Sequence, residues 1–282
     1  MKAKLVDVFA EGKLTGNGLT IFWNCTDLSS DDMQALTQEM RQFESVFVQG
    51  EPEGNTVRAR IFTMEEELDF AGHPLIGLAA HLHEEYGTKD THQWIIELTS
   101  RHVHLVSYSR GDHYSAEMKQ GAPEFISVLD QSARDEILSA LNIRNSDTAN
   151  LPCEVISTGL PYLIVPVTHG IERARILTTD FESLLYRHGA KFVYVLDVHS
   201  FEGRTWDNEG NVEDIATGSA AGPAAAFLCK AGLVSGNTSF HIRQGRMFGR
   251  PSNIGVFIET NEGTITDIVV RGDIHTVASI SF

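Results

Sequence analysis

The chain has 282 residues, which suggests two domains at about 100–200 residues per domain. Hydrophobic residues make up 42% and charged residues 21% of it, a composition typical of globular proteins rather than of disordered ones. The 38 acidic and 22 basic residues give a formal net charge of −16, which disfavours nucleic-acid binding because that needs a basic face.

The start of the chain, its apolar runs and its cysteines indicate where the protein is located, and the cysteines fit a reducing compartment. Asp7 interrupts the first apolar residues, so the start predicts a strand rather than a signal peptide. No apolar run approaches the length of a membrane span. Cys25, Cys153 and Cys229 are isolated and form no CxxC pair, so neither a disulfide framework nor a zinc site is indicated. We therefore expect a soluble cytoplasmic protein without membrane or nucleic-acid partners.

The first half alternates short strands with two helices. Ser29 and the acids after it predict a helix start, and Met33, Leu36, Met40 and Phe43 follow at helical spacing. A second helix is predicted over residues 73–86, ended by Gly87. Strands are predicted over residues 5–9, 19–23, 46–49, 57–62, 95–98, 102–107 and 114–118.

The second half repeats this order of elements. A helix over residues 130–141 belongs to neither series, and the junction is placed near it, which gives halves of residues 1–120 and 121–276. The last predicted strand, 277–282, is a candidate to return to the first half. The other strands are predicted over residues 154–157, 163–167, 192–197, 204–206, 240–243, 253–259 and 265–270, with helices after Thr179-Asp180 and over residues 219–231.

An internal repeat supports this division. At a shift of 145 residues, Asp69-Phe70-Ala71 falls on Asp214-Ile215-Ala216, and Gly77 falls on Gly222. Ala and Gly are common and align easily by chance. Because the matches keep their order and the element order repeats too, a duplication is the better interpretation.

Each repeated motif leads into a helix start, at Gly72-His73-Pro74 and at Gly218-Ser219. A helix N-terminus offers unpaired N–H groups and a partial positive charge. Two such starts facing each other would make an anion site inside an acidic protein, and a small carboxylate substrate is expected there.

The halves differ at positions where chemistry would need asymmetry, since Glu44 falls on Gly189 and His73 falls on Gly218. A carboxylate at Glu44, near a desolvated interface, can carry a proton, although a solvated helix-end acid is the commoner role of a glutamate. His73 can shuttle a proton or donate to substrate, or simply satisfy the turn.

Asp214 can orient His73 or share its proton, and Ser219 can donate to a substrate oxygen. For both residues helix capping is the ordinary alternative. His102 and His104 share one face of a strand but have no third metal ligand at a useful spacing, so a solvated strand face is favoured. Residues 217–222 lack the lysine of a P-loop and the Rossmann spacing, so no nucleotide site is predicted.

Together these motifs resemble the PhzF-like (phenazine biosynthesis) family, which has the diaminopimelate epimerase-like fold. The matching stretches are Thr15-Gly16-Asn17, residues 43–48, Ala71-Gly72-His73-Pro74 and residues 213–223. The resemblance implies an α+β fold of two pseudo-symmetric halves, each a mostly antiparallel sheet wrapped around a central helix, with the active site between them.

The resemblance also implies a homodimeric isomerase that moves a proton on a small anionic metabolite, without cofactor or metal. Family members with known chemistry isomerise dihydro-3-hydroxyanthranilate. The proton carrier of the motif maps to Glu44, and its other catalytic residues map to His73 and Asp214. Gly18 and Ile215 stand where the family usually has proline, which leaves the acid–base residues intact but the substrate open.

The substrate-binding positions implied by the resemblance are Gly72 and Ser219, and the helix starts at Gly72 and Gly218 are expected to hold the substrate carboxylate. The main alternative is a non-catalytic metabolite-binding or protein-interaction module on the same fold, because a fold does not fix a function. A metal-dependent hydrolase using His102 and His104 is a weaker alternative. A racemase with two catalytic thiols is disfavoured because no cysteine lies at a helix start.

Overall fold

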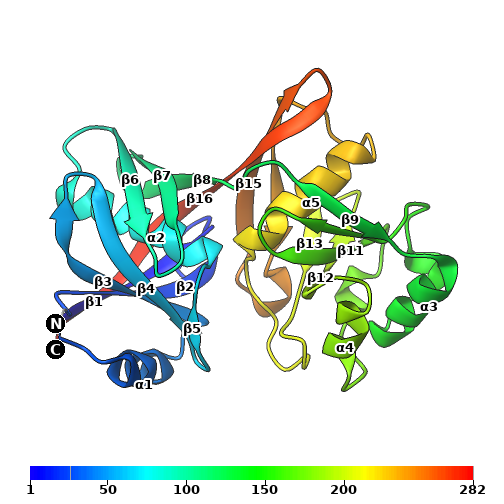
Figure 1. Cartoon of the computed structure of the whole chain (residues 1–282), viewed down its shortest axis with the longest axis horizontal. Coiled ribbons are helices and arrows are strands. Elements are labelled where there is room, and N and C mark those ends of the chain that lie inside the picture. Colours follow the sequence, from blue (N-terminus) through cyan, green and yellow to red (C-terminus); the bar gives the residue numbers. More distant parts are fainter. Residues whose placement is uncertain (26, 282) are drawn as a thin grey trace. The chain divides into compact units, whose positions relative to one another are not determined.

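The computed structural model describes residues 1–25 and 27–281 and divides the chain into two compact units. Unit 1 comprises Met1–Lys119, Arg250–Asn253 and Arg271–Phe282. Unit 2 comprises Gln120–Gly249 and Ile254–Val270. Neither unit is therefore one continuous stretch of sequence (Figure 1).

Unit 1 is a mixed sheet built around one helix. Its elements are β1 (Lys2–Val8), β2 (Asn17–Trp23), α1 (Ser30–Met40), β3 (Glu44–Glu53), β4 (Thr56–Thr63), β5 (Glu67–Leu68), α2 (Gly72–Tyr86), β6 (Thr91–Glu97), β7 (His102–Ser109), β8 (Tyr114–Lys119) and the end of β16 (Thr264–Ser281). The strand order is β1-β2-β3-β4-β6-β7-β8, and β16 pairs with both β8 and β1. The sheet therefore closes on itself, with α2 against its inner face.

Unit 2 repeats this plan. Its elements are β9 (Glu124–Val128), α3 (Gln131–Ala140), η1 (Asn145–Asp147), β10 (Glu154–Ser157), β11 (Pro161–Val167), η2 (Ile171–Arg173), α4 (Phe181–Tyr186), β12 (Phe192–Asp197), β13 (Glu202–Arg204), α5 (Gly218–Lys230), β14 (Ser239–Gln244), η3 (Arg246–Phe248), β15 (Ser252–Asn261) and the start of β16. The strands lie in the order β9-β10-β11-β12-β13-β14-β15-β16.

The two units share the same sequence of strand pairings. The pairs β2–β3 and β11–β12 are parallel and are joined through α1 and α4, respectively. The pairs β4–β6 and β13–β14 are also parallel and are joined through α2 and α5. The pairs between them, β3–β4 and β12–β13, are antiparallel. This confirms the pseudo-symmetric halves predicted from the 145-residue shift.

The glycines of the repeat explain how each central helix fits its sheet. A Cβ on Gly77 would lie 2.4 Å from a methyl carbon of Leu19, and one on Gly222 would lie 2.0 Å from the Gln120 side chain. Residues Gly72 to His83 of α2 are all buried, which is typical of a helix that is apolar on every side. On the outer face, Met33 of α1 packs into a cluster with Phe47.

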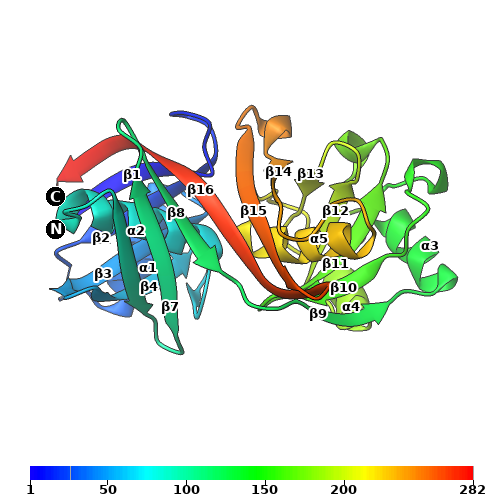
Figure 2. The same cartoon turned by 90° about the horizontal axis from the view of Figure 1, so that it is seen from above.

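Several strand predictions need correction. The strands predicted over residues 265–270 and 277–282 form one strand, β16, although residue 282 lies outside the described residues (Figure 2). Gly272 lies within this strand, and the Phe9 ring occupies the space of its missing Cβ, at 2.5 Å. Trp206 makes only an isolated bridge to Glu213 instead of extending β13, and β5 and β9 were not predicted.

Arg250 fastens the turn between β1 and β2. Its Nη2 donates to Asp7 Oδ1 at 2.6 Å and its Nε donates to the carbonyl of Gly16 at 2.8 Å. Gly16 has φ +68°, and a Cβ there would lie 2.5 Å from the Val8 carbonyl oxygen, so only glycine fits. This turn directly precedes Asn17, the first residue of β2.

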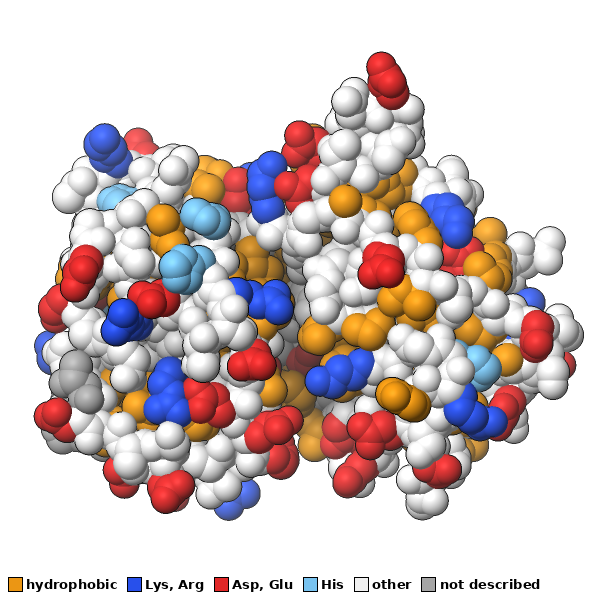
Figure 3. Space-filling model, in the orientation of Figure 1, with side chains coloured by type: hydrophobic (Ala, Val, Ile, Leu, Met, Phe, Trp, Pro, Cys, Tyr) orange, Lys and Arg blue, Asp and Glu red, His pale blue; other side chains and the backbone are white. Residues whose placement is uncertain are grey.

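Acidic residues are the more numerous charged residues of the chain. On the face shown in Figure 3, Asp and Glu side chains are spread over both units, and Lys and Arg side chains stand mostly singly among them. This agrees with the net charge of −16. Within residues 1–25 and 27–281, no helix is both long enough and apolar enough to cross a membrane.

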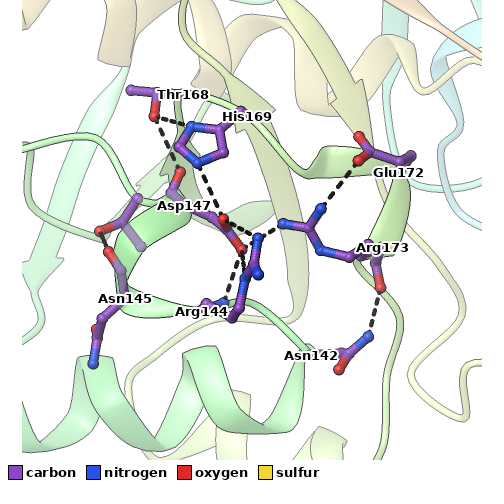
Figure 4. Close-up of polar contacts among 9 residues, drawn as sticks. Asn142, Arg144, Asn145, Asp147, Thr168, His169, Glu172 and Arg173 are labelled. Carbon is purple, nitrogen blue, oxygen red and sulfur yellow. Dashed lines mark hydrogen bonds and ion pairs between the residues drawn. The ribbon is translucent and has the colours of Figure 1, made fainter.

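A cluster of ionic groups in unit 2 surrounds the buried carboxylate of Asp147 (Figure 4). Arg144 Nη2 lies 2.9 Å from Oδ1, Arg173 Nη2 lies 2.7 Å from Oδ2, and His169 Nε2 lies 3.2 Å from Oδ1. Hydrogen bonds from Arg144 and then from Arg173 hold the pKa of Asp147 well below its usual range. One carboxylate thereby ties η1, η2 and the loop after β11 together.

Replacing Asp147 by asparagine is expected to lower the free energy of unfolding by about 1.5–3 kcal/mol at pH 6, because hydrogen bonds to a charged group are lost. A depressed pKa in the folded state stabilises the protein above the unfolded-state pKa, and this contribution fades as the pH falls below about 4. Urea unfolding at pH 6 and pH 3.5 should show the difference between wild type and D147N shrinking. A difference independent of pH would contradict the ionic origin.

Candidate active site

Glu44 and His73 meet inside unit 1. Glu44 is the first residue of β3 and lies beside Leu19 of the parallel strand β2, so strand pairing fixes its backbone. His73 is the second residue of α2. The distance between His73 Nδ1 and Glu44 Oε2 is 2.9 Å, and the two side chains are only 5% and 8% exposed. A carboxylate and an imidazole in contact, shielded from bulk water, are a suitable pair for moving a proton.

Gly72 places the start of α2 at this pair. The preceding residue, Ala71, is extended and makes no side-chain hydrogen bond to cap the helix. The positive end of the helix dipole therefore lies next to His73 without a side-chain cap, which suits an anionic ligand.

Asp214 lies in unit 2, in the loop before α5. Its Oδ2 accepts a hydrogen bond of 2.5 Å from the hydroxyl of Thr217, the residue that precedes α5. Gln244, at the end of β14, donates through Nε2 to Thr217 Oγ1 at 2.9 Å and to the Asp214 carbonyl at 2.7 Å. All three residues are buried. The loop is thus fixed by a polar network.

Gly218 and Ser219 form the first turn of α5. The Gly218 carbonyl accepts a hydrogen bond of 2.9 Å from Gln120 Nε2. The Ser219 hydroxyl lies 2.8 Å from the Tyr162 hydroxyl of β11. Ser219 is therefore engaged by a neighbouring strand and does not cap its own helix, which makes a tyrosine–serine pair of hydroxyls at the helix start.

The structure brings two of the predicted catalytic residues, Glu44 and His73, into contact. The contacts of Asp214 described here lie within its own unit, and a role for it beside His73 stays a prediction. Sequence reasoning did not single out Tyr162 or Gln244. Tyr162 lies in an apolar strand and Gln244 directly after a predicted strand, and no local pattern distinguishes either.

The histidines weighed as metal ligands lie on β7, which pairs with β6 and β8. His102 and His104 occupy exposed positions of β7, on the same face. In the part of the chain that the structure describes, no group of three or more His, Cys, Asp or Glu side chains is placed to hold a metal ion.

The fold and the polar residues at its helix starts define the class of protein. A solved structure from Pseudomonas aeruginosa, described as a predicted epimerase, matches 100% of this chain and 98% of its own, with 44% identity and a TM-score of 0.93. One from Agrobacterium radiobacter, described as a probable proline racemase, has the same fold at 11% identity, with coverage of 100% and 92% and a TM-score of 0.63. The fold is therefore that of the diaminopimelate epimerase-like racemases and isomerases.

Sequence comparison identifies the family. The model for phenazine biosynthesis-like proteins, PhzC-PhzF, matches residues 6–279, and this chain belongs to that family. Trans-2,3-dihydro-3-hydroxyanthranilate isomerase of Pseudomonas chlororaphis is 31% identical over 277 residues, 95% of this chain and 94% of the relative. The enzyme of the same name from Pseudomonas aeruginosa is 32% identical over 279 residues, with the same coverage. The chain is an isomerase.

Proposed function

We propose that this isomerase moves a proton between two carbon atoms of a small unsaturated or cyclic carboxylic acid, with Glu44 as the proton carrier and without a cofactor. The observation that carries the proposal is the contact of 2.9 Å between Glu44 and His73, buried at the start of α2.

The proposed step is a balanced rearrangement. The Glu44 carboxylate takes a proton from one carbon, and the electrons of that C–H bond form a new C=C bond. The electrons of the neighbouring double bond then take the same proton back from Glu44 at the far carbon. Nothing is oxidised or reduced, and Glu44 ends in its starting state. His73 contacts Oε2 of Glu44 and is proposed to keep the carboxylate in place while it exchanges the proton.

Two features support a carboxylic acid as the substrate. The uncapped start of α2 offers local positive potential within an acidic protein. The relatives named trans-2,3-dihydro-3-hydroxyanthranilate isomerase act on a ring compound with a carboxyl group, as their name states. Asp214 and Ser219 are proposed to complete substrate binding and charge stabilisation, with Gly72 and Gly218 at the helix starts.

The substrate is proposed only as a class because the start of β2, the strand that pairs with β3 at Glu44, differs from the family pattern. Gly18 replaces the usual proline, and the Oε1 atom of Gln42 lies 2.1 Å from where a Cβ of Gly18 would be. In this chain the Gln42 side chain thus takes the space that a proline ring would need.

Solvent-deuterium uptake followed by NMR tests the proposal. Wild type and E44Q are incubated in D₂O with a panel of small unsaturated and amino carboxylic acids that includes trans-2,3-dihydro-3-hydroxyanthranilate. Deuterium at carbon with wild type but not with E44Q is the expected result. Equal uptake by both proteins would overturn the role of Glu44.

We also propose that the protein is cytoplasmic and forms a homodimer, as family resemblance led us to expect. Light scattering coupled to size-exclusion chromatography checks the second point, because a monomer would elute with the chain mass of 31.1 kDa.

A further inference from the structure

Gln244 is a buried amide with every hydrogen-bonding position in use. Its two N–H groups go to the Asp214 carbonyl, at 2.7 Å, and to Thr217 Oγ1, at 2.9 Å. Its Oε1 accepts from the Thr217 backbone N–H and from the Tyr194 hydroxyl, each at 3.2 Å. Gln244 is 1% exposed. A primary amide has two donors and two acceptor lone pairs, so every donor and acceptor of Gln244 has a partner.

The hydrogen bonds through Thr217 have a fixed direction. A hydroxyl has one proton to donate, and Thr217 gives it to Asp214 Oδ2, at 2.5 Å. Gln244 must then be the donor to Thr217 Oγ1. The amide of Gln244, the hydroxyl of Thr217 and the carboxylate of Asp214 form a directed chain, in which each bond polarises the next.

Tyr194 completes the network from the other side. Burial, together with the nearby Asp214, raises the pKa of the Tyr194 phenol, so its hydroxyl stays a neutral donor to Gln244. The ring lies directly over Gly203, where a Cβ would be 2.0 Å from it, so this glycine admits the tyrosine. Besides Asp214, the ionisable groups acting on Tyr194 are Tyr162 and Glu202.

We propose that Gln244 is a positioning residue for the reaction, which fixes the carboxylate of Asp214 and the start of α5 through Thr217. The inference rests on the proposed function. Gln244 does not have to touch substrate: it sets the direction of the Thr217 hydroxyl and supplies an acceptor for the backbone N–H that precedes α5, a helix without a side-chain cap. Loss of this control misplaces Asp214, and small misplacements of active groups cost about 10²-fold in rate.

Q244E is the sharpest test because it keeps the shape of the side chain and removes its donors. When ionised, the new carboxylate repels the Asp214 carbonyl and draws the Thr217 hydroxyl away from Asp214. When protonated, it has one O–H to donate and restores part of the network. We expect kcat/KM for the best acid of the panel to fall about 10–100-fold at pH 8, relative to wild type, and to recover in part towards pH 5.

Matched variants separate positioning from general damage. Q131E adds the same charge on the exposed start of α3 and should follow wild type at every pH. T217S keeps the hydroxyl and should retain activity, whereas T217V should lose it. Circular dichroism and thermal unfolding establish that each variant is folded. If Q244E does not fold, the comparison of T217S with T217V still tests whether the hydroxyl that links Gln244 to Asp214 is needed for activity.

A readout independent of turnover separates this inference from the proposed function. The protection of the Thr217 amide against hydrogen exchange should fall in Q244M, which removes the oxygen that accepts from this N–H, and should be kept in Q244E, whose carboxylate still accepts, even if E44Q proves active. A folded Q244E with wild-type kcat/KM at pH 8 would overturn the role of Gln244, as would an unchanged Thr217 amide in Q244M or equal activity of T217S and T217V.

Discussion

E44Q is expected to lower kcat by about 10²–10⁴-fold, the range that a positioned acid–base group contributes. The glutamine amide has nearly the size and shape of the carboxylate and still has a polar atom to contact His73, so the buried site keeps its packing. It cannot take up a proton from carbon. The loss should therefore fall on kcat, with little change in KM, measured as initial rates of deuterium uptake on the best acid of the panel.

Two further variants sharpen this result. E53Q changes an exposed glutamate of the same strand, β3, and should leave kcat unchanged. E44D keeps a carboxylate but withdraws it by one methylene, so its activity should lie between those of wild type and E44Q. A folded E44Q with more than a tenth of the wild-type kcat would remove Glu44 from the proton transfer.

E213A is expected to cause the largest loss of stability, about 3–5 kcal/mol, because it leaves a buried guanidinium without its partner. Arg204 donates to both carboxylate oxygens of Glu213, at 2.8 Å and 2.5 Å, and the side chains are only 10% and 3% exposed. Arg204 also donates to the carbonyls of Ile171 and Ala174 and lies over the Trp206 ring. Urea unfolding followed by circular dichroism measures the change.

The exposed pair of Glu172 with Arg173 is the matched control, since both side chains are about half exposed. E172A should cost at most about 1 kcal/mol, because water and salt screen exposed ion pairs. If E213A cost no more than E172A, the Arg204–Glu213 pair would not anchor the loop that leads to Asp214.

The parts of the fold that the sequence revealed are those with local or repeated signals. Helix starts were marked by Ser29 and by the glycines that begin α2 and α5. The repeat was recognised from matches such as Gly77 with Gly222. Glu44 and His73 were recognised as candidate catalytic residues because both belong to motifs that break the symmetry of the repeat, whereas their contact was not predicted. Each of these signals lies within a few residues of chain or recurs at one fixed shift.

The missed features depend on contacts between distant residues. Gln244 forms hydrogen bonds with Thr217, which is 27 residues away in the sequence, and with Tyr194, which is 50 residues away. A single glutamine has no sequence pattern that predicts such partners. The continuity of β16 through Gly272 was missed because the Phe9 ring, which occupies the space of the missing Cβ, lies at the other end of the sequence. A glycine that ends a strand and one that makes room for a ring look alike in one sequence.

The pairing of β1 with β16 sets the order in which the protein can be completed on the ribosome. Residues Lys2 and Ser281 are partners in the sheet, so the barrel that β1 begins closes only after β16 has been made. Unit 2 has all its residues once Val270 has been added, before unit 1 does. Unit 1 is thus begun before unit 2 but completed after it, and β1 must wait for its partner until the residues of unit 2 have been made.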